Sequence, residues 1–170
     1  MPMGASNALT VQTVQGDLLR VPADAIVNPW NRNYMPRWLR PGGISGQLQA
    51  GSGPGPWDEL ASHGLLQLGE AVVTSAGQLT TARSLIHVAG LNLLWRASPR
   101  SVALSVHSAV EAAVAHRFAT ITMPLIGAGH GHLSADASRS TIHAALGELR
   151  HVPLPQPLAV RIVELPAAAA

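Results

Sequence analysis

The sequence predicts an α/β fold in which strands and helices alternate along the chain. Short runs of β-branched and apolar residues, such as 9–15 and 24–28, are typical of strands. The segment 98–116 repeats apolar side chains on one helical face. Glycine-rich turns at 42–46 and 127–131 each follow a strand-like run. Alternation of this kind builds a layered sheet that is covered by helices.

Two strands and two helices are expected between residues 9 and 63. Pro29 has no N–H, so it should end the pairing of the second strand. Residues 32–40 are irregular and aromatic, and we expect them to form a loop over a ligand site. Ser45 is placed to cap a helix that begins near Gly46. The expected strands are 9–15 and 24–28, and the expected helices are 45–50 and 57–63.

Residues 69–165 continue the pattern of strands and helices. Ser98 followed by Pro99 marks the start of the longest helix, because proline is favoured at the first helical position. Ser134 is expected to cap the last helix. His87 falls inside a buried strand, where we expect a core histidine whose hydrogen bonds are satisfied. The expected strands are 69–77, 84–90, 120–126 and 158–165, the expected helices are 98–116 and 134–150, and residues 1–8 and 166–170 should be loose ends.

The composition excludes several kinds of active site. All 11 cationic side chains are Arg, so a Walker P-loop, a kinase lysine and a Schiff base, which each need a lysine amine, are excluded. There is no Cys, and hence no disulfide and no cysteine nucleophile. No apolar run approaches a membrane span, and a net charge of +2 from scattered Arg indicates no nucleic-acid surface. We expect one soluble, cytoplasmic, monomeric domain over residues 1–170 that needs no cofactor.

Two glycine-rich turns suggest where a ligand binds. The turns at 42–46 and 127–131 should both lie at the carboxyl edge of the sheet, where open α/β folds bind ligands. Backbone N–H groups at such turns suit an anion, and two turns can clasp a pyrophosphate. The second turn departs from the dinucleotide fingerprint, because His132 stands where a third glycine is expected. A tight strand-to-helix turn without a ligand would explain either turn alone.

In their order along the chain, these motifs resemble the macrodomain family, whose members bind ADP-ribose. Residues 16–18 (GDL) are similar to the family's GDI turn, and residues 24–31 (DAIVNPWN) are similar to its DAIVNAAN. Residues 42–46 (GGISG) match its first glycine loop. The resemblance covers nearly the whole chain and implies a three-layer α/β/α sandwich with a central mixed, mostly parallel sheet. The match continues in order through residues 69–77, 85–90 and 123–129.

The resemblance also implies a ligand and the residues that bind it. Asp17 would bind the adenine amino group, the Leu18 amide the adenine ring, and Asn31 the distal ribose. The chemistry agrees, because a carboxylate accepts from an amine and backbone N–H groups cradle phosphate. A simple turn residue for Asp17 and a local Asx turn for Asn31 are the alternatives. The diphosphate would be held by Gly42, Gly43, Ile44, Ser45, Gly127, Ala128, Gly129, His130 and Gly131.

The chain departs from the hydrolytic members of the family at the expected site. Those members carry Asp where this chain has Ser45, so the usual general base is missing. Their second loop has an aromatic residue where this chain has His130 and Gly131. Trp30 or Tyr34 could supply a surface on which the ribose stacks, and a place in the core is an equal alternative for Trp30.

Three functions are open on the sequence alone. The first is hydrolysis of ADP-ribosyl esters on Asp or Glu of mono-ADP-ribosylated proteins, with Asn31, Ser45 and His130 as the catalytic candidates. Asn31 would orient the ribose, Ser45 would hydrogen-bond the water, and His130 would carry a proton. The second is recognition of ADP-ribose, free or attached to proteins, without turnover. The third makes His130 and His132 half of a metal site, but zinc needs three or four ligands and no third is spaced nearby, so we expect no metal.

Overall fold

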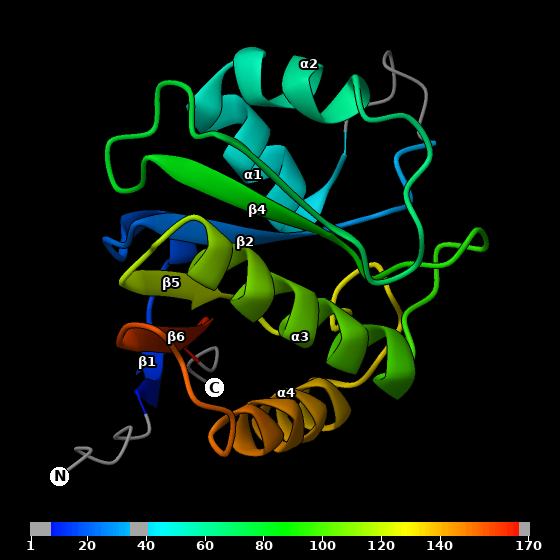
Figure 1. The fold of residues 1–170 in the computed structure, drawn as a ribbon. Coiled ribbons are helices and arrows are strands. Elements are labelled where there is room, and N and C mark those ends of the chain that lie inside the picture. Colours follow the sequence, from blue (N-terminus) through cyan, green and yellow to red (C-terminus); the bar gives the residue numbers. More distant parts are fainter. Residues whose placement is uncertain (1–7, 35–40, 167–170) are drawn as a thin grey trace, which may run out of the picture.

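The structure is a computed structural model that describes residues 8–34 and 41–166. Within these residues, a six-stranded sheet lies between two pairs of helices (Figure 1). This arrangement confirms the expected α/β/α sandwich. Most of the two ends that were expected to be loose, and residues 35–40 of the expected aromatic loop, lie outside the described residues.

The strands of the sheet are all parallel except at one edge. They are β1 (Leu9–Gln15), β2 (Ala25–Trp30), β3 (Ala71–Ser75), β4 (Ser84–Ala89), β5 (Thr120–Met123) and β6 (Leu158–Glu164). Their order in the sheet is β1-β6-β5-β2-β4-β3, and only β3 runs antiparallel to its neighbour, β4. The parallel strands β2 and β5 therefore end at the same edge, as the two glycine turns that follow them require.

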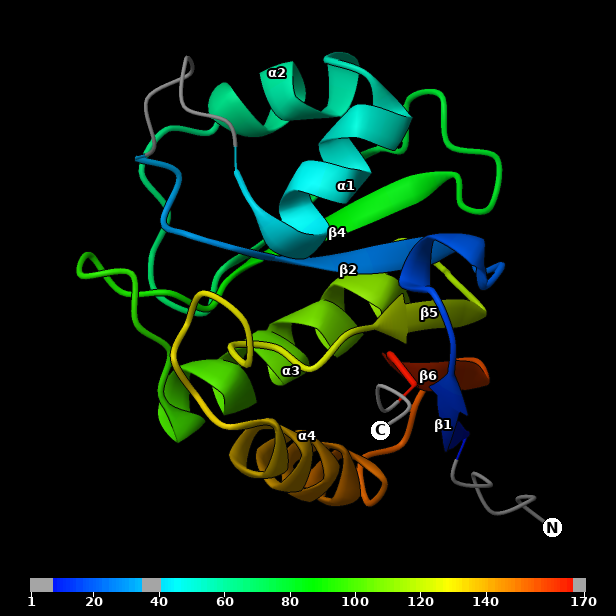
Figure 2. The ribbon, with the colours of Figure 1, turned by 180° about the vertical axis from the view of Figure 1, so that it is seen from behind.

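Among the described residues, four α-helices cover the sheet, two on each face (Figures 1 and 2). They are α1 (Gly43–Ser52), α2 (Gly55–Ala61), α3 (Pro99–Ala115) and α4 (Ala135–Leu149). The predicted caps of the two long helices are confirmed, because Ser98 forms a capping box with Ser101 and the Ser134 hydroxyl accepts from the Ala137 N–H. None of the described helices is long and apolar enough to cross a membrane.

Alternate side chains of β2 supply both hydrophobic cores, as the period of a strand requires. Ala25 and Val27 pack in the core under α3 and α4, together with Val106 of α3. Ile26 and Trp30 pack in the second core under α1 and α2. The first half of β2 is fully buried, which agrees with a central strand that is covered on both faces.

Two local predictions for the segment 29–46 are wrong. Pro29 does not end β2, which continues to Trp30 in register with β4. Because β5 pairs only with Ala25 and Ile26, the proline lies where one neighbour of β2 has already ended, so its missing N–H breaks no ladder there. Ser45 is not a helix cap, because α1 begins at Gly43 and the serine lies inside its first turn.

Candidate functional site

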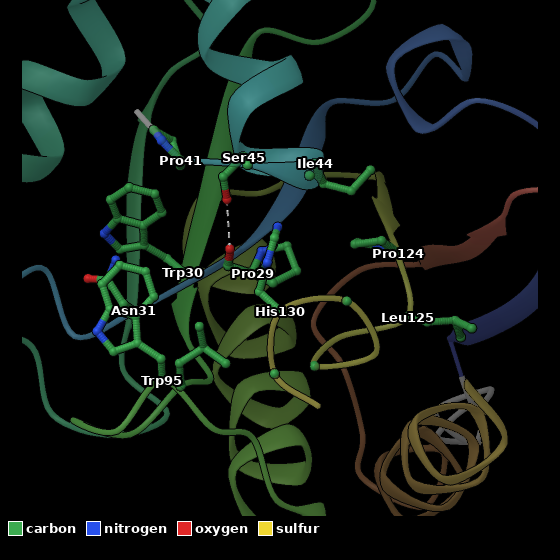
Figure 3. A pocket seen from close by; sticks show the side chains of 16 residues that line it. Pro29, Trp30, Asn31, Pro41, Ile44, Ser45, Trp95, Pro124, Leu125 and His130 are labelled. Carbon is green, nitrogen blue, oxygen red and sulfur yellow. Dashed lines mark hydrogen bonds between the residues drawn. The ribbon is translucent and has the colours of Figure 1, made fainter. Parts of the chain in front are cut away.

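A cavity of about 240 Å³ opens where β2 and β5 end, between the two glycine loops (Figure 3). The first loop leads from β2 into α1, and the second leads from β5 into α4. The two loops therefore meet at one edge of the sheet although they are about 85 positions apart in the chain. The lining residues are Pro29, Trp30, Asn31, Pro41, Gly42, Gly43, Ile44, Ser45, Leu91, Trp95, Pro124, Leu125, Gly127, Gly129, His130 and Gly131.

The first loop places the N-terminus of α1 at the cavity. Gly42 is the N-cap, and it has no side chain that could occupy the first N–H groups of the helix. Gly43 has a φ of +60°, a conformation that residues with a side chain rarely adopt. Helix N–H groups that lack an internal partner and face a cavity suit an anion such as a phosphate.

The glycines of the second loop have different reasons for being glycine. A Cβ at Gly127 would lie 2.6 Å from the Cβ of Ala97, and a Cβ at Gly131 would lie 2.6 Å from the carbonyl oxygen of Gly127. These two positions are therefore glycine because the loop folds tightly on itself and packs against Ala97, just before α3. A Cβ at Gly129 would meet no atom within 4 Å, so packing does not require glycine there. The open space beside Gly129 is where a ligand can approach the backbone.

His130 closes the gap between the two loops. A Cβ at Gly42 would lie 2.8 Å from His130 Nε2, and one at Gly43 would lie 3.4 Å from His130 Cδ2. The imidazole of the second loop thus rests on the glycines of the first, over the cavity (Figure 3). The structure therefore brings together the candidates Gly42, Gly43, Ser45, Gly129 and His130.

The side chain of Asn31 lies in the wall of the cavity and is only 2% exposed. Its Oδ1 accepts from the Asn33 N–H at 2.6 Å and from the Tyr34 N–H at 3.3 Å. The local Asx turn that the sequence left open is thus present. Because both hydrogen bonds use Oδ1, the amide nitrogen Nδ2 is the part of Asn31 that can donate to a ligand.

Ser45 also lines the cavity and is 8% exposed. Its hydroxyl donates to Asn28 Oδ1 at 2.8 Å. The Pro29 carbonyl, at 3.0 Å, is a second acceptor for the same hydrogen (Figure 3). Both acceptors belong to β2, and Asn28 is fully buried and does not line the cavity. The hydroxyl hydrogen is therefore held away from the cavity, toward β2.

Two aromatic side chains, Trp30 and Trp95, line the cavity, and each packs against another aromatic ring. Trp30 is 8% exposed and packs on Trp57 at 5.2 Å between ring centroids, so it belongs to the core as well as to the cavity wall. Tyr34 meets Trp95 edge to face at 5.9 Å, and its hydroxyl donates to the carbonyl of Leu93 at 3.0 Å. Burial raises the pKa of Tyr34 above its ordinary value.

Trp95 is one of the cavity residues that sequence reasoning missed, together with Pro41, Leu91, Pro124 and Leu125. It lies in the loop between β4 and α3 and has a φ of +62°, which is uncommon for a bulky residue. The side chain of Asn92 holds this loop by accepting from the N–H groups of Leu94 and Arg96. A signal was available, because Trp95 follows a buried strand at the same sheet edge as the glycine loops.

Three of the predicted ligand residues do not line the cavity, namely Asp17, Leu18 and Ala128. Asp17 caps the short 3-10 helix Leu18–Arg20 by accepting from the Leu19 N–H at 3.0 Å. The side chain of Leu18 is buried in the core under α1 and α2. The assignment of Asp17 and Leu18 to the adenine and that of Ala128 to the diphosphate stay predictions.

His87 lies behind the cavity on β4 and is fully buried. Its Nδ1 is 2.9 Å from Asn28 Nδ2, and its Nε2 is 2.9 Å from Thr74 Oγ1. Burial lowers the pKa of His87 to about 3, because the interior disfavours the charged imidazolium. The expectation of a satisfied core histidine is confirmed, and the ring is neutral at physiological pH.

The cavity wall contains no carboxylate among the described residues, and its polar side chains are Asn31, Ser45 and His130. In the described part of the chain, no three His, Asp or Glu residues come together in a way that could hold a metal ion. What the wall offers is a set of backbone N–H groups, one amide, one hydroxyl and one imidazole. Such a site can bind a phosphate-containing ligand and orient a water, but it has no carboxylate base.

Comparison with known proteins agrees with this geometry. The sequence model of the family described as "Macro domain" matches residues 27–142. A curated relative, the O-acetyl-ADP-ribose deacetylase of Salmonella gallinarum, is 30% identical over 155 residues, which cover 86% of this chain and 83% of the relative. An uncharacterized protein of Aeropyrum pernix is 33% identical over 140 residues, covering 76% of this chain and 67% of that protein.

Solved structures agree on the fold. The Oceanobacillus iheyensis macrodomain with ADP superposes with a TM-score of 0.75 at 22% identity, covering 94% of this chain and 85% of the other. The Trypanosoma brucei macrodomain in complex with ADP-ribose gives a TM-score of 0.75 at 20% identity, covering 96% and 67%. The fold, the two glycine loops at the carboxyl edge and the match over residues 27–142 lead to one conclusion: the chain belongs to the Macro domain family.

Proposed function

We propose that the protein binds ADP-ribose in this cavity and hydrolyses esters of its distal ribose. The observation that carries the proposal is the pair of glycine loops, with open space at Gly129 and the N-terminus of α1 facing it. Backbone N–H groups of both loops would hold the diphosphate. The curated relative's name supports an ester of ADP-ribose as the substrate class. Esters on Asp or Glu of mono-ADP-ribosylated proteins are the substrates that we propose.

The polar groups of the wall suggest how the ester is positioned. Asn31 Nδ2 would donate to a ribose hydroxyl, since its Oδ1 is occupied by the Asx turn. Ser45 would hydrogen-bond the attacking water. An acyl ester is reactive enough that holding water and carbonyl in the correct geometry can supply much of the rate without a strong base. His130 would carry a proton, because an imidazole can both donate and accept one and this ring lies over the cavity.

Incubation with two substrates tests the proposal. O-acetyl-ADP-ribose and an acceptor protein that is mono-ADP-ribosylated on Glu would each be mixed with the protein, and release of acetate or of ADP-ribose would be measured. We expect turnover of the protein ester, and Gly129→Val should abolish it. Turnover of O-acetyl-ADP-ribose alone would correct the substrate while keeping the ester chemistry.

A second candidate function is recognition of ADP-ribose without turnover. One observation favours it, namely that the cavity wall carries no carboxylate among the described residues. Retention of the label on both substrates, together with tight binding of ADP-ribose in calorimetry, would support this reader function over the hydrolase.

A further inference from the structure

A line of buried hydrogen bonds leads from the cavity into the sheet, and the proposed function uses only its first residue, Ser45. It starts at Ser45 on α1 and passes through Asn28 on β2 and His87 on β4 to Thr74 on β3. The three distances are 2.8, 2.9 and 2.9 Å. All four side chains are buried, and only that of Ser45 lines the cavity. Adjacent strands carry the line, because Asn28 and His87 stand opposite each other in the β2–β4 ladder.

The hydrogen bond that Thr74 makes to Ser75 determines which group donates and which accepts at every step of the line. The Thr74 hydroxyl donates its single hydrogen to the Ser75 carbonyl at 2.9 Å, so toward His87 it can only accept. His87 must then carry its proton on Nε2, which leaves Nδ1 as an acceptor for the Asn28 amide. Asn28 accordingly presents Oδ1 to Ser45. The neutral ring that this order requires agrees with the low pKa of buried His87.

We propose that this line fixes Ser45 as a hydrogen-bond acceptor toward the cavity, with Asn28, His87 and Thr74 as positioning residues. The serine hydrogen is committed to Asn28 Oδ1 and to the Pro29 carbonyl, so only the lone pairs of Ser45 Oγ can face a ligand. The group that it receives is a donor, and the attacking water of ester hydrolysis is that donor. The inference rests on the proposed function for the identity of this water.

This arrangement gives the serine one property of a carboxylate. A carboxylate accepts hydrogen bonds and donates none. A free hydroxyl can do both, and it would lose part of its orienting effect by turning its hydrogen toward the water. The buried line removes that freedom, although it supplies no basicity. The cost of burying four polar side chains is offset because each finds a partner.

The variant that tests the line is Thr74→Val, which lies outside the cavity. It removes the acceptor for His87 Nε2–H, so the ring should move its proton to Nδ1 and the Asn28 amide should flip. Ser45 should then accept from Asn28 Nδ2, which occupies a lone pair that would otherwise face the cavity, while its hydrogen keeps the Pro29 carbonyl. We expect kcat for the ester to fall roughly tenfold with KM unchanged, the size of losing one orienting contact. Thr74→Ser keeps the hydroxyl and should restore kcat.

A matched control and a double-mutant cycle separate this effect from general destabilisation. Thr122→Val on β5 also removes a buried threonine hydroxyl, one that has no hydrogen-bond partner in the described part of the chain, and it should leave kcat unchanged. In a Ser45→Ala background, Thr74→Val should change kcat by less than about twofold, because its effect passes through the serine. If Thr74→Val lowers kcat in the Ser45→Ala background by the same factor as in the unmutated protein, the inference is overturned.

The tautomer can be read without any activity. In protein labelled with ¹⁵N histidine, the ring of His87 should show the neutral Nε2–H form, and Thr74→Val should shift it toward Nδ1–H. An Nδ1–H ring in the unmutated protein would overturn the inference even if the ester is hydrolysed. A protein that binds ADP-ribose without turnover would overturn the hydrolase and the water-orienting role together, whereas turnover with multiplying losses would overturn only the role of the line.

Discussion

At the scale of single residues, two side chains of the cavity are shared between the fold and the ligand. Asn31 uses Oδ1 to hold an Asx turn, and Ser45 uses its hydrogen to bond β2. The groups that remain for a ligand are the Nδ2 donor of Asn31 and the acceptor lone pairs of Ser45 Oγ. This division explains why substitutions to Ala would mix the two roles, and why isosteric variants are more informative.

Asn31→Asp separates the two roles of the asparagine. A carboxylate still accepts from the Asn33 and Tyr34 N–H groups, so the turn should persist, but the Nδ2 donor is lost. We expect kcat for ester hydrolysis to fall roughly ten- to a thousandfold, the scale of losing an orienting or charge-stabilising contact. Steady-state kinetics with the protein ester would measure the change. Unchanged kcat in a folded variant would show that Asn31 has only its structural role.

Gly129→Val tests the diphosphate site at the second loop. Because a Cβ at Gly129 meets no atom within 4 Å, the variant should fold normally, while its branched side chain fills the space that a ligand needs. Calorimetry should detect no binding of ADP-ribose. Gly147→Val is the matched control, since its position on α4 is equally open and does not line the cavity. Normal affinity in Gly129→Val would place the diphosphate elsewhere.

The buried His87 predicts a dependence of stability on pH. Its pKa is about 3 in the folded protein against an ordinary value of 6.5, because burial disfavours the charged ring. Between these values the unfolded chain binds one more proton than the folded one, so the free energy of unfolding falls as pH decreases through this window, by up to about 1.4 kcal/mol per pH unit. Urea unfolding at several pH values should show a shallower slope in His87→Gln. His143→Gln, on the exposed side of α4, should keep the full slope.

At the scale of elements, the turn between β3 and β4 is fastened to the end of α1. Gln78 N–H donates to the Ser52 carbonyl at 2.9 Å, and Trp57 of α2 donates to the Ser52 hydroxyl at 3.0 Å. Gly77 has a φ of +57° and faces the same carbonyl so closely that a Cβ there would collide with it. The antiparallel edge of the sheet and the helix that carries Ser45 are thus held together by one turn.

Gly77→Ala should therefore destabilise the fold by about 1–3 kcal/mol, from backbone strain and from the collision with the Ser52 carbonyl. Gly64→Ala is the matched control, because Gly64 has a similar φ of +65° with no atom near a Cβ and would show the strain alone. Urea unfolding of both variants would measure the difference. Equal losses would mean that the turn yields and that the contact with α1 is not rigid.

At the scale of the whole molecule, the proposed ligand connects the two helical layers. The first glycine loop continues into α1 on one face of the sheet, and the second continues into α4 on the other (Figures 1 and 2). A diphosphate held by both loops would contact segments that meet only in the folded protein. Binding should therefore stabilise the molecule as one unit.

Scanning calorimetry can measure this coupling. At a concentration of ADP-ribose one hundred times its Kd, we expect the folded state to gain about 2.7 kcal/mol and the single unfolding transition to move to a higher temperature. Gly129→Val should show no shift at the same concentration. Separate transitions, of which only one responds to the ligand, would contradict a single cooperative unit.

Much of the fold could be predicted from local sequence, because periodicity, caps and turn residues act over a few positions. Strand β1 has the predicted bounds, and the caps Ser98 and Ser134 begin α3 and α4 as predicted. Errors arose where a neighbour in space overrides a local preference. β2 continues past Pro29 because β5 has already ended beside it, so the missing N–H of the proline breaks no pairing.

The sequence by itself determined the α/β alternation, the two glycine loops and the family, since each is written in the order of short motifs. Only the tertiary structure decided what the site residues can do. Trp95 joins the wall of the cavity. The line of hydrogen bonds from Ser45 to Thr74 also forms only on folding, because its two middle residues, Asn28 and His87, are 59 positions apart in the chain. The physical reason is that a hydrogen bond depends on the distance and direction between two groups in space, and a local sequence pattern records neither for segments that meet only on folding.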